Sequence, residues 1–99
     1  MRIAIDDSAA AVAPDVHAWL LRYAATELAR EAAVEQVRVR FLPDREGYGC
    51  VVAVGLAGGS LVAERGRSCS LIVAAVRAIR LAARRVREAP ARLRARGTG

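Results

Sequence analysis

The residues best placed to do chemistry are four arginines in the C-terminal half of the chain. They recur every three or four positions, at Arg77, Arg80, Arg84 and Arg87. In a helix, which turns 100° per residue, all four fall within about 80° of one another, and Glu88 is the only acid near them. Pairing between residues i and i+4 therefore does not neutralise the row, whereas guanidinium groups spaced along one helix can bind successive phosphates. The pattern predicts a polyanion-binding surface in preference to an ordinary solvated helix face.

The distribution of charge supports this prediction. The 99 residues include 16 arginines, no lysine and ten acids, which gives a net charge of +6 and a pI near 10.9. Residues 1–50 hold six arginines against eight acids (−2), and residues 51–99 hold ten against two (+8). A compositional bias explains arginine in place of lysine, but it does not explain why the charge gathers in one half. RNA, DNA and anionic lipid are the candidate partners.

The other reactive residue types give no catalytic or metal-binding pattern. Asp6, Asp7, Ser8 and His17 have no spacing that supports catalysis. No phosphate-binding loop follows the glycines at 55–59. One histidine and two cysteines without CxxC or HxxxH spacing do not make a metal-site motif. We therefore expect no enzymatic activity, no cofactor, no metal and no small-molecule substrate.

The sequence is typical of a cytoplasmic protein. Its longest apolar run, at about 50–57, is much shorter than a membrane span. Asp6 and Asp7 stand where a secretory signal would have its apolar centre. Cys50 and Cys69 each lie in an apolar setting, so we expect two buried, reduced thiols.

Apolar periodicity predicts one domain, residues 1–90, built from four strands and two helices. The expected elements are strands at 2–6, 36–42, 50–56 and 60–65, a helix from Pro14 to about Ala33, and a last helix from about residue 70 to Pro90. Ser68 or Ser70 is expected to cap the last helix, after a break in the strand pattern at 66–68. Residues 91–99 are expected to form a flexible basic tail.

The alternation at 36–42 indicates how the layers are arranged. Val37, Val39 and Phe41 point one way while Arg38 and Arg40 point the other, so one face of the sheet is buried and one is wet. Both helices are then expected on the buried face. The sequence predicts an α+β two-layer sandwich of order β-α-β-β-β-α, with a four-stranded mixed sheet whose first two strands are parallel.

Some arginines outside the row are open to two interpretations. Arg38 and Arg40 either extend the basic surface or pair with a cross-strand acid such as Glu64. The tail arginines either order on a polyanion or only keep the chain end soluble; they are Arg92, Arg94 and Arg96. A membrane surface ranks below RNA as the partner, because the apolar stripe of the last helix is needed to cover the sheet.

With this order of elements, the sequence resembles the short ribosome hibernation-promoting factors, or ribosomal subunit interface proteins. The resemblance covers nearly the whole chain and is carried by apolar positions and turns. These lie at 1–5, in the helix from Pro14, at 37–41, in the hairpin at 52–63, and at Ala75, Val76 and Ile79. The resemblance implies a fold similar to double-stranded RNA-binding domains. It also implies binding to the small ribosomal subunit where messenger and transfer RNA would lie, which holds idle ribosomes inactive in stress.

The resemblance further implies that basic residues on the two helices contact rRNA. On the last helix only Arg85 falls on a basic position of the family, and Arg77 stands where members commonly have Asp. On the first helix Arg22 matches a basic position, and Arg30 adds charge that nearby glutamates dilute. The expected RNA-binding residues are Arg77, Arg80, Arg84, Arg85, Arg87, Arg22 and Arg30.

The sequence therefore predicts a bacterial, cytoplasmic, non-catalytic factor that binds rRNA phosphates of the small ribosomal subunit and inhibits translation by occupancy. Two alternatives stay open. One is a stand-alone module for other structured RNA. The other is a protein-interaction or dimerisation domain that uses its sheet face or an edge strand, and the sequence does not settle whether a weak homodimer forms.

Overall fold

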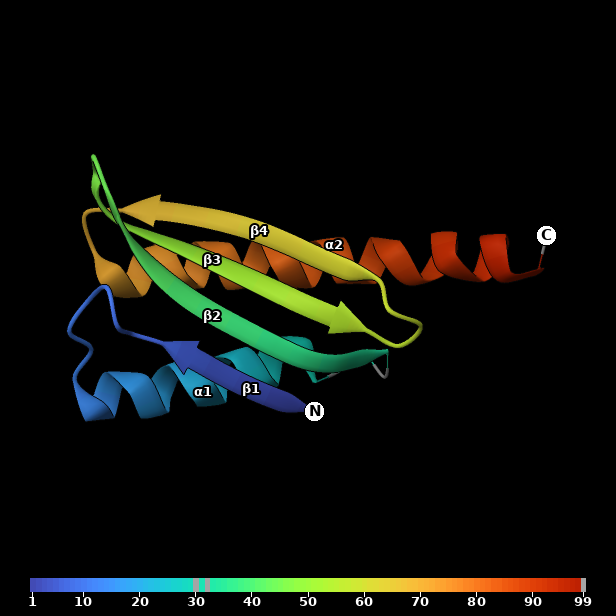
Figure 1. Ribbon diagram of the computed structural model, residues 1–99, viewed down its shortest axis with the longest axis horizontal. Coiled ribbons are helices and arrows are strands. Elements are labelled where there is room, and N and C mark those ends of the chain that lie inside the picture. Colours follow the sequence, from blue (N-terminus) through green and yellow to red (C-terminus); the bar gives the residue numbers. More distant parts are fainter. Residues whose placement is uncertain (30, 32, 99) are drawn as a thin grey trace.

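The computed structural model shows an α+β two-layer sandwich, which confirms the predicted class and element order (Figure 1). The structure describes the chain except residues 30, 32 and 99, and over 89–98 it describes the backbone only. The elements are β1 (Arg2–Asp6), α1 (Pro14–Leu28), β2 (Val34–Asp44), β3 (Gly47–Leu56), β4 (Leu61–Ser68) and α2 (Leu71–Thr98).

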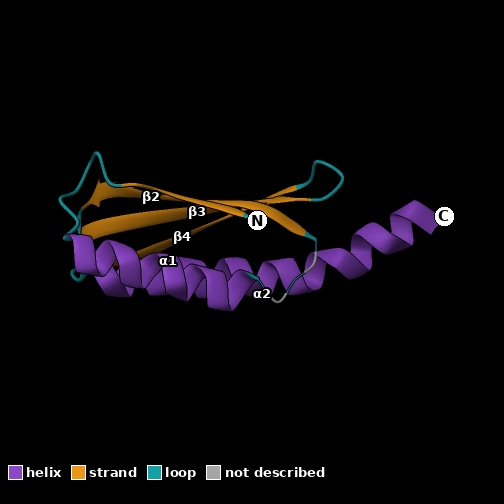
Figure 2. Ribbon diagram, turned by 90° about the horizontal axis from the view of Figure 1, so that it is seen from below, coloured by secondary structure: helices purple, strands orange, loops and turns teal. Residues whose placement is uncertain are grey.

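The four strands form one sheet in the order β1-β2-β3-β4. β1 runs parallel to β2, with Ile3 opposite Val37, and the remaining pairs are antiparallel. Both helices cover the same face of this sheet and leave the other face open (Figure 2). Arg38 and Arg40 are exposed while Val37, Val39 and Phe41 are buried, as the alternation predicts.

The core lies between the sheet and the two helices. α1 begins with Pro14 at its first turn, followed by Asp15, and buries Leu20, Ala24 and Leu28. α2 buries Ile79 and Val86 together with a series of alanines at positions 74, 75, 78, 82 and 83. Because alanine side chains are short, α2 packs close to the sheet.

Gly66 is the point of closest approach between α2 and the edge strand β4. A Cβ atom at this position would collide with the backbone oxygen of Ala74 and would lie 2.7 Å from the amide nitrogen of Ala78. The break predicted at 66–68 is therefore wrong. The glycine lets β4 continue to Ser68 directly against the helix.

Three other predicted features need correction. α1 ends at Leu28 and not near Ala33, because the chain has already joined the sheet by Ala33, whose carbonyl accepts a 2.7 Å hydrogen bond from the amide of Ala57. α2 continues through Pro90 to Thr98, since the alanine-, arginine- and leucine-rich sequence around the proline favours helix. The mobility of the segment 91–99 stays a prediction.

The third correction concerns the cysteines. Both are free thiols, but Cys50 is buried whereas Cys69 is exposed, because Cys69 follows the end of β4. Burial raises the pKa of the Cys50 thiol to about 12. At the start of α2, the Ser70 hydroxyl accepts a 3.4 Å hydrogen bond from the amide of Val73, so Ser70 is the capping residue.

Candidate nucleic-acid interface

The predicted arginine row is exposed along α2, beside the face of the helix that packs on the sheet. Arg77, Arg80 and Arg84 are all exposed, whereas Ala78 and Ile79, which lie between Arg77 and Arg80 in the sequence, are fully buried. Helical periodicity thus separates an apolar face from a cationic one. The structure presents the row to solvent as predicted.

Two arginines of the row are held in place by neutral acceptors. Arg77 Nη1 donates a 2.7 Å hydrogen bond to the backbone oxygen of Arg67 on β4. Arg80 Nε donates a 3.1 Å hydrogen bond to the hydroxyl of Tyr23 on α1. Neither contact neutralises the guanidinium charge, so both side chains are oriented and still cationic.

The other arginines of α2 differ in how their charge is balanced. Arg85 Nε lies 3.1 Å from a carboxylate oxygen of Glu64 on β4. Arg87 lies at 3.9 Å from both Glu27 and Glu31, which is too long for a hydrogen bond. Among the residues whose side chains the structure describes, no acid pairs with Arg84. Among the same side chains no acid pairs with Arg77 or Arg80 either, so these three are the uncompensated cations of the row.

The remaining predicted contacts have different outcomes. Arg22 is exposed on α1, beside Trp19 and Ile72. Arg30 lies outside the described residues, and so do the side chains of the tail arginines at 92, 94 and 96. The structure thus brings Arg22 to the same helical layer as the row on α2.

Sequence reasoning missed two arginines of β4. Arg65 and Arg67 flank Gly66 on the edge strand, and with Arg77 and Arg80 they line a hollow of about 640 Å³ between β4 and α2. Glu46 and Leu81 complete its lining. A strand that alternates Arg-Gly-Arg beside a helix was the available signal, but the predicted break at 66–68 concealed it.

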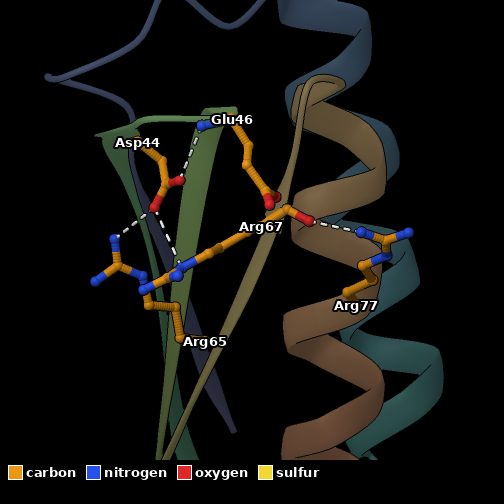
Figure 3. Close-up of polar contacts among 5 residues, drawn as sticks. All are labelled: Asp44, Glu46, Arg65, Arg67 and Arg77. Carbon is orange, nitrogen blue, oxygen red and sulfur yellow. Dashed lines mark hydrogen bonds and ion pairs between the residues drawn. The ribbon is translucent and has the colours of Figure 1, made fainter.

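The carboxylate of Asp44 forms ion pairs with both of these arginines (Figure 3). Asp44 Oδ2 lies 3.0 Å from Arg65 Nη2 and 3.2 Å from Arg67 Nε, and the Asp44 side chain is only 8% exposed. The amide of Glu46 donates a 3.1 Å hydrogen bond to Asp44 Oδ1. This backbone hydrogen bond is the main reason why the pKa of Asp44 is lowered from its ordinary value, and the two guanidinium groups lower it further.

Arg38 and Arg40 alternate on β2 with residues buried under the helices, so they lie on the open face of the sheet, opposite the helical layer. They therefore do not extend the row on α2. The suggested pairing with Glu64 is also wrong, because Glu64 points to the helix side and contacts Arg85. Arg40 instead lies 3.9 Å from Asp6 of the neighbouring strand.

The described residues contain neither a metal-binding cluster nor a membrane-spanning helix. In this part of the chain, no group of three or more His, Cys, Asp or Glu side chains could hold a metal ion. Within the same part of the chain, no helix has the length and apolarity needed to span a membrane. The basic surface of the helical layer is thus the main functional candidate.

Comparisons with known proteins give a clear result for the fold. No protein-family model matches the sequence, and no curated protein matches it. Among solved structures, the N-terminal domain of Thermus thermophilus Protein Y has a TM-score of 0.69 at 17% identity, covering 88% of this chain and 93% of that one. A ribosomal subunit interface protein from Coxiella burnetii has a TM-score of 0.73 at 13% identity, covering 92% and 99%. The chain therefore has the fold of the ribosomal subunit interface proteins over nearly its whole length.

Proposed function

We propose that this chain is a member of the ribosome hibernation-promoting family and acts as a cytoplasmic, non-catalytic factor on the small ribosomal subunit. It binds rRNA phosphates and holds idle ribosomes inactive by occupying the channel for messenger and transfer RNA. The observation that supports this most is the outward row of Arg77, Arg80 and Arg84 on a fold shared with ribosomal subunit interface proteins.

The arginines that we expect to contact phosphate are chosen by the hydrogen-bond and acid partners of each guanidinium group. Arg77 and Arg80 are oriented by neutral acceptors, and Arg84 lies beside them without an acid partner among the described side chains. Oriented cations lose little conformational entropy when they bind a phosphate, and they can bind it through two hydrogen bonds. We therefore place these three, together with Arg22, at the centre of the contact surface.

Arg85 and Arg87 belong to the margin of the same surface. Both are more than half exposed although they face acids. Exposed ion pairs are weak, with a typical strength of about 0–1 kcal/mol, so a phosphate can compete with Glu64, Glu27 and Glu31. Their contribution to binding is accordingly smaller than that of Arg84. Arg30, adjacent in sequence to Glu31, is proposed as a further marginal contact.

Specificity would come from shape. Duplex-like RNA displays its phosphates and 2′-hydroxyl groups on a surface of regular geometry, and proteins read it largely through that geometry. α2 packs on the sheet and holds its exposed cations at a fixed helical spacing, which suits such recognition.

The proposal is tested by comparing purified small ribosomal subunits with a generic RNA duplex at about 0.15 M salt. We expect at least a tenfold preference for the subunits. Equal affinity for both would favour the alternative of a general structured-RNA module. A stable dimer in sedimentation analysis that binds neither would favour the protein-interaction alternative and contradict the proposal.

A further inference from the structure

An aromatic pair, the exposed Trp19 and the partly buried Tyr23, lies on α1 next to the basic surface. The rings of Trp19 and Tyr23 stack with their centroids 5.2 Å apart and their planes 4° from parallel. Trp19 remains 39% exposed, whereas Phe41 is fully buried. The chain has only four aromatic residues, and two of them form this stack at the surface.

The indole borders a hollow between the two helices. Its volume is about 310 Å³, and its lining combines Trp19, Val16 and Ile72 with the charged residues Asp15 and Arg22. This volume is at the lower end of the ~300–1,000 Å³ typical of small-ligand sites. A planar, mostly apolar group with polar edges fits such a lining.

The aromatic stack is hydrogen-bonded to the arginine row of α2. The Tyr23 hydroxyl accepts the hydrogen bond from Arg80 Nε at 3.1 Å, so the guanidinium of Arg80 is held at the edge of the stack. Arg22 provides a second cation, at the hollow itself. An aromatic surface between two cations is the arrangement that proteins use for single-stranded nucleic acid, where a base stacks and its flanking phosphates bind arginine.

We infer that Trp19 stacks on one unpaired base of the bound RNA while Arg22 and Arg80 bind the phosphates on either side of it. The inference rests on the proposed function and adds a base-stacking site to a surface otherwise assigned to phosphates. Asp15 indicates that the base, and not a phosphate, enters the hollow, since its carboxylate repels a phosphate and accepts hydrogen bonds from a base amino group. The surrounding cations favour RNA over an ordinary protein partner.

The test uses intrinsic fluorescence, because Trp19 is the only tryptophan in the chain. The full chain is titrated at low salt with an eight-nucleotide oligo(rA) and with an abasic ribose-phosphate chain of the same length. We expect oligo(rA) to quench Trp19 and to bind more tightly than the abasic chain. Equal affinity and equal quenching by the two probes would overturn the inference, because phosphates alone would then account for binding.

Three variants separate stacking from folding. Trp19→Ala is expected to lower the affinity for oligo(rA) by about 5- to 100-fold, and Trp19→Phe to retain most of it. Tyr48→Ala is the matched control, since Tyr48 is 37% exposed and does not line the hollow. Thermal unfolding followed by circular dichroism shows whether Trp19→Ala is still folded. If it is not, the comparison of oligo(rA) with the abasic chain is made on the folded Trp19→Phe variant.

The outcomes distinguish this inference from the proposed function. If Trp19→Ala binds small ribosomal subunits and oligo(rA) as tightly as the unaltered chain, the base site is wrong and the proposed function stands. If the unaltered chain binds neither RNA probe nor subunits, both are wrong. Quenching by an acidic peptide but not by RNA would assign the aromatic pair to a protein partner and would also overturn the inference.

Discussion

Arg80 Nε on α2 and the Tyr23 hydroxyl on α1 form a hydrogen bond of 3.1 Å across 57 positions of sequence. The contact joins the two helices at the surface that we assign to RNA. It uses the Nε–H of the guanidinium and leaves the terminal amino groups available for a phosphate. A structural contact thereby orients a binding residue.

Tyr23→Phe tests this orientation. Removing the hydroxyl is expected to reduce the free energy of unfolding by no more than about 1 kcal/mol, as for a single partly exposed hydrogen bond. The affinity for small ribosomal subunits is expected to fall severalfold, because Arg80 then loses its fixed position. Binding measured by filter retention, with urea unfolding in parallel, checks both values. Unchanged affinity would show that Arg80 needs no positioning by Tyr23.

Arg84→Ala tests the phosphate contact itself. The substitution is expected to lower RNA affinity and to flatten the plot of log affinity against log salt by about one unit, since one phosphate contact is lost. Arg38→Ala is a control that removes the same charge from the open face of the sheet. If both variants change the slope equally, net charge and not the helical row governs binding.

Gly66→Ala tests the packing of the edge strand β4 on α2. The added methyl group would collide with the backbone of Ala74 and Ala78, which has no flexible end to move aside. We expect the free energy of unfolding to fall by about 3 kcal/mol or more in urea titration.

Gly55→Ala is the control for this change. Its added Cβ would lie 3.3 Å from Cγ of Gln36, a flexible side chain that can move. We expect a change of less than about 1 kcal/mol. Similar losses in the two variants would mean that the close approach at Gly66 is not special.

Asp44→Asn tests the acid that links Arg65 and Arg67. The pKa of Asp44 is lower in the folded chain than its ordinary 3.8, so its carboxylate stabilises the fold fully above about pH 4. This contribution is lost as the pH falls through the lowered folded-state value. Urea midpoints between pH 2.5 and 7, chosen as about the range of this titration, should fall less steeply with acid in Asp44→Asn than in the unaltered chain.

Asp7→Asn is the matched control for the acid series, because no ion pair of Asp7 occurs among the described residues. Its acid dependence should follow that of the unaltered chain. If Asp44→Asn shows the same acid dependence as the unaltered chain, the contacts of Asp44 with Arg65 and Arg67 do not contribute to stability.

Most of the fold could be predicted from periodicity, because alternation at 36–42 and the helical spacing in α2 each assign a buried face. The end of α1 could not, since it depends on where Ala33 joins the sheet. The continuation of β4 past Gly66 could not be predicted either. A glycine in a strand pattern marks either a break or a close approach of another backbone, and the sequence alone does not distinguish the two.

The candidate site was predicted in part for a similar reason. The row at Arg77, Arg80 and Arg84 follows from local spacing on one helix. The positions of Arg65 and Arg67, and the pairing of Arg85 with Glu64, depend on which residues the tertiary fold brings together. The Trp19–Tyr23 stack was not predicted, because helical spacing brings side chains four positions apart near each other without fixing how their rings lie.

The most direct test of the account is co-sedimentation with ribosomes on sucrose gradients at low and physiological salt. The double variants Arg80→Ala/Arg84→Ala and Arg38→Ala/Arg40→Ala remove the same charge from the helical layer and from the open sheet face. We predict that the unaltered chain and the Arg38/Arg40 variant migrate with the small subunit or the whole ribosome at physiological salt, and that the Arg80/Arg84 variant stays at the top. Unaltered chain at the top of the gradient, or equal loss in both double variants, would contradict the account.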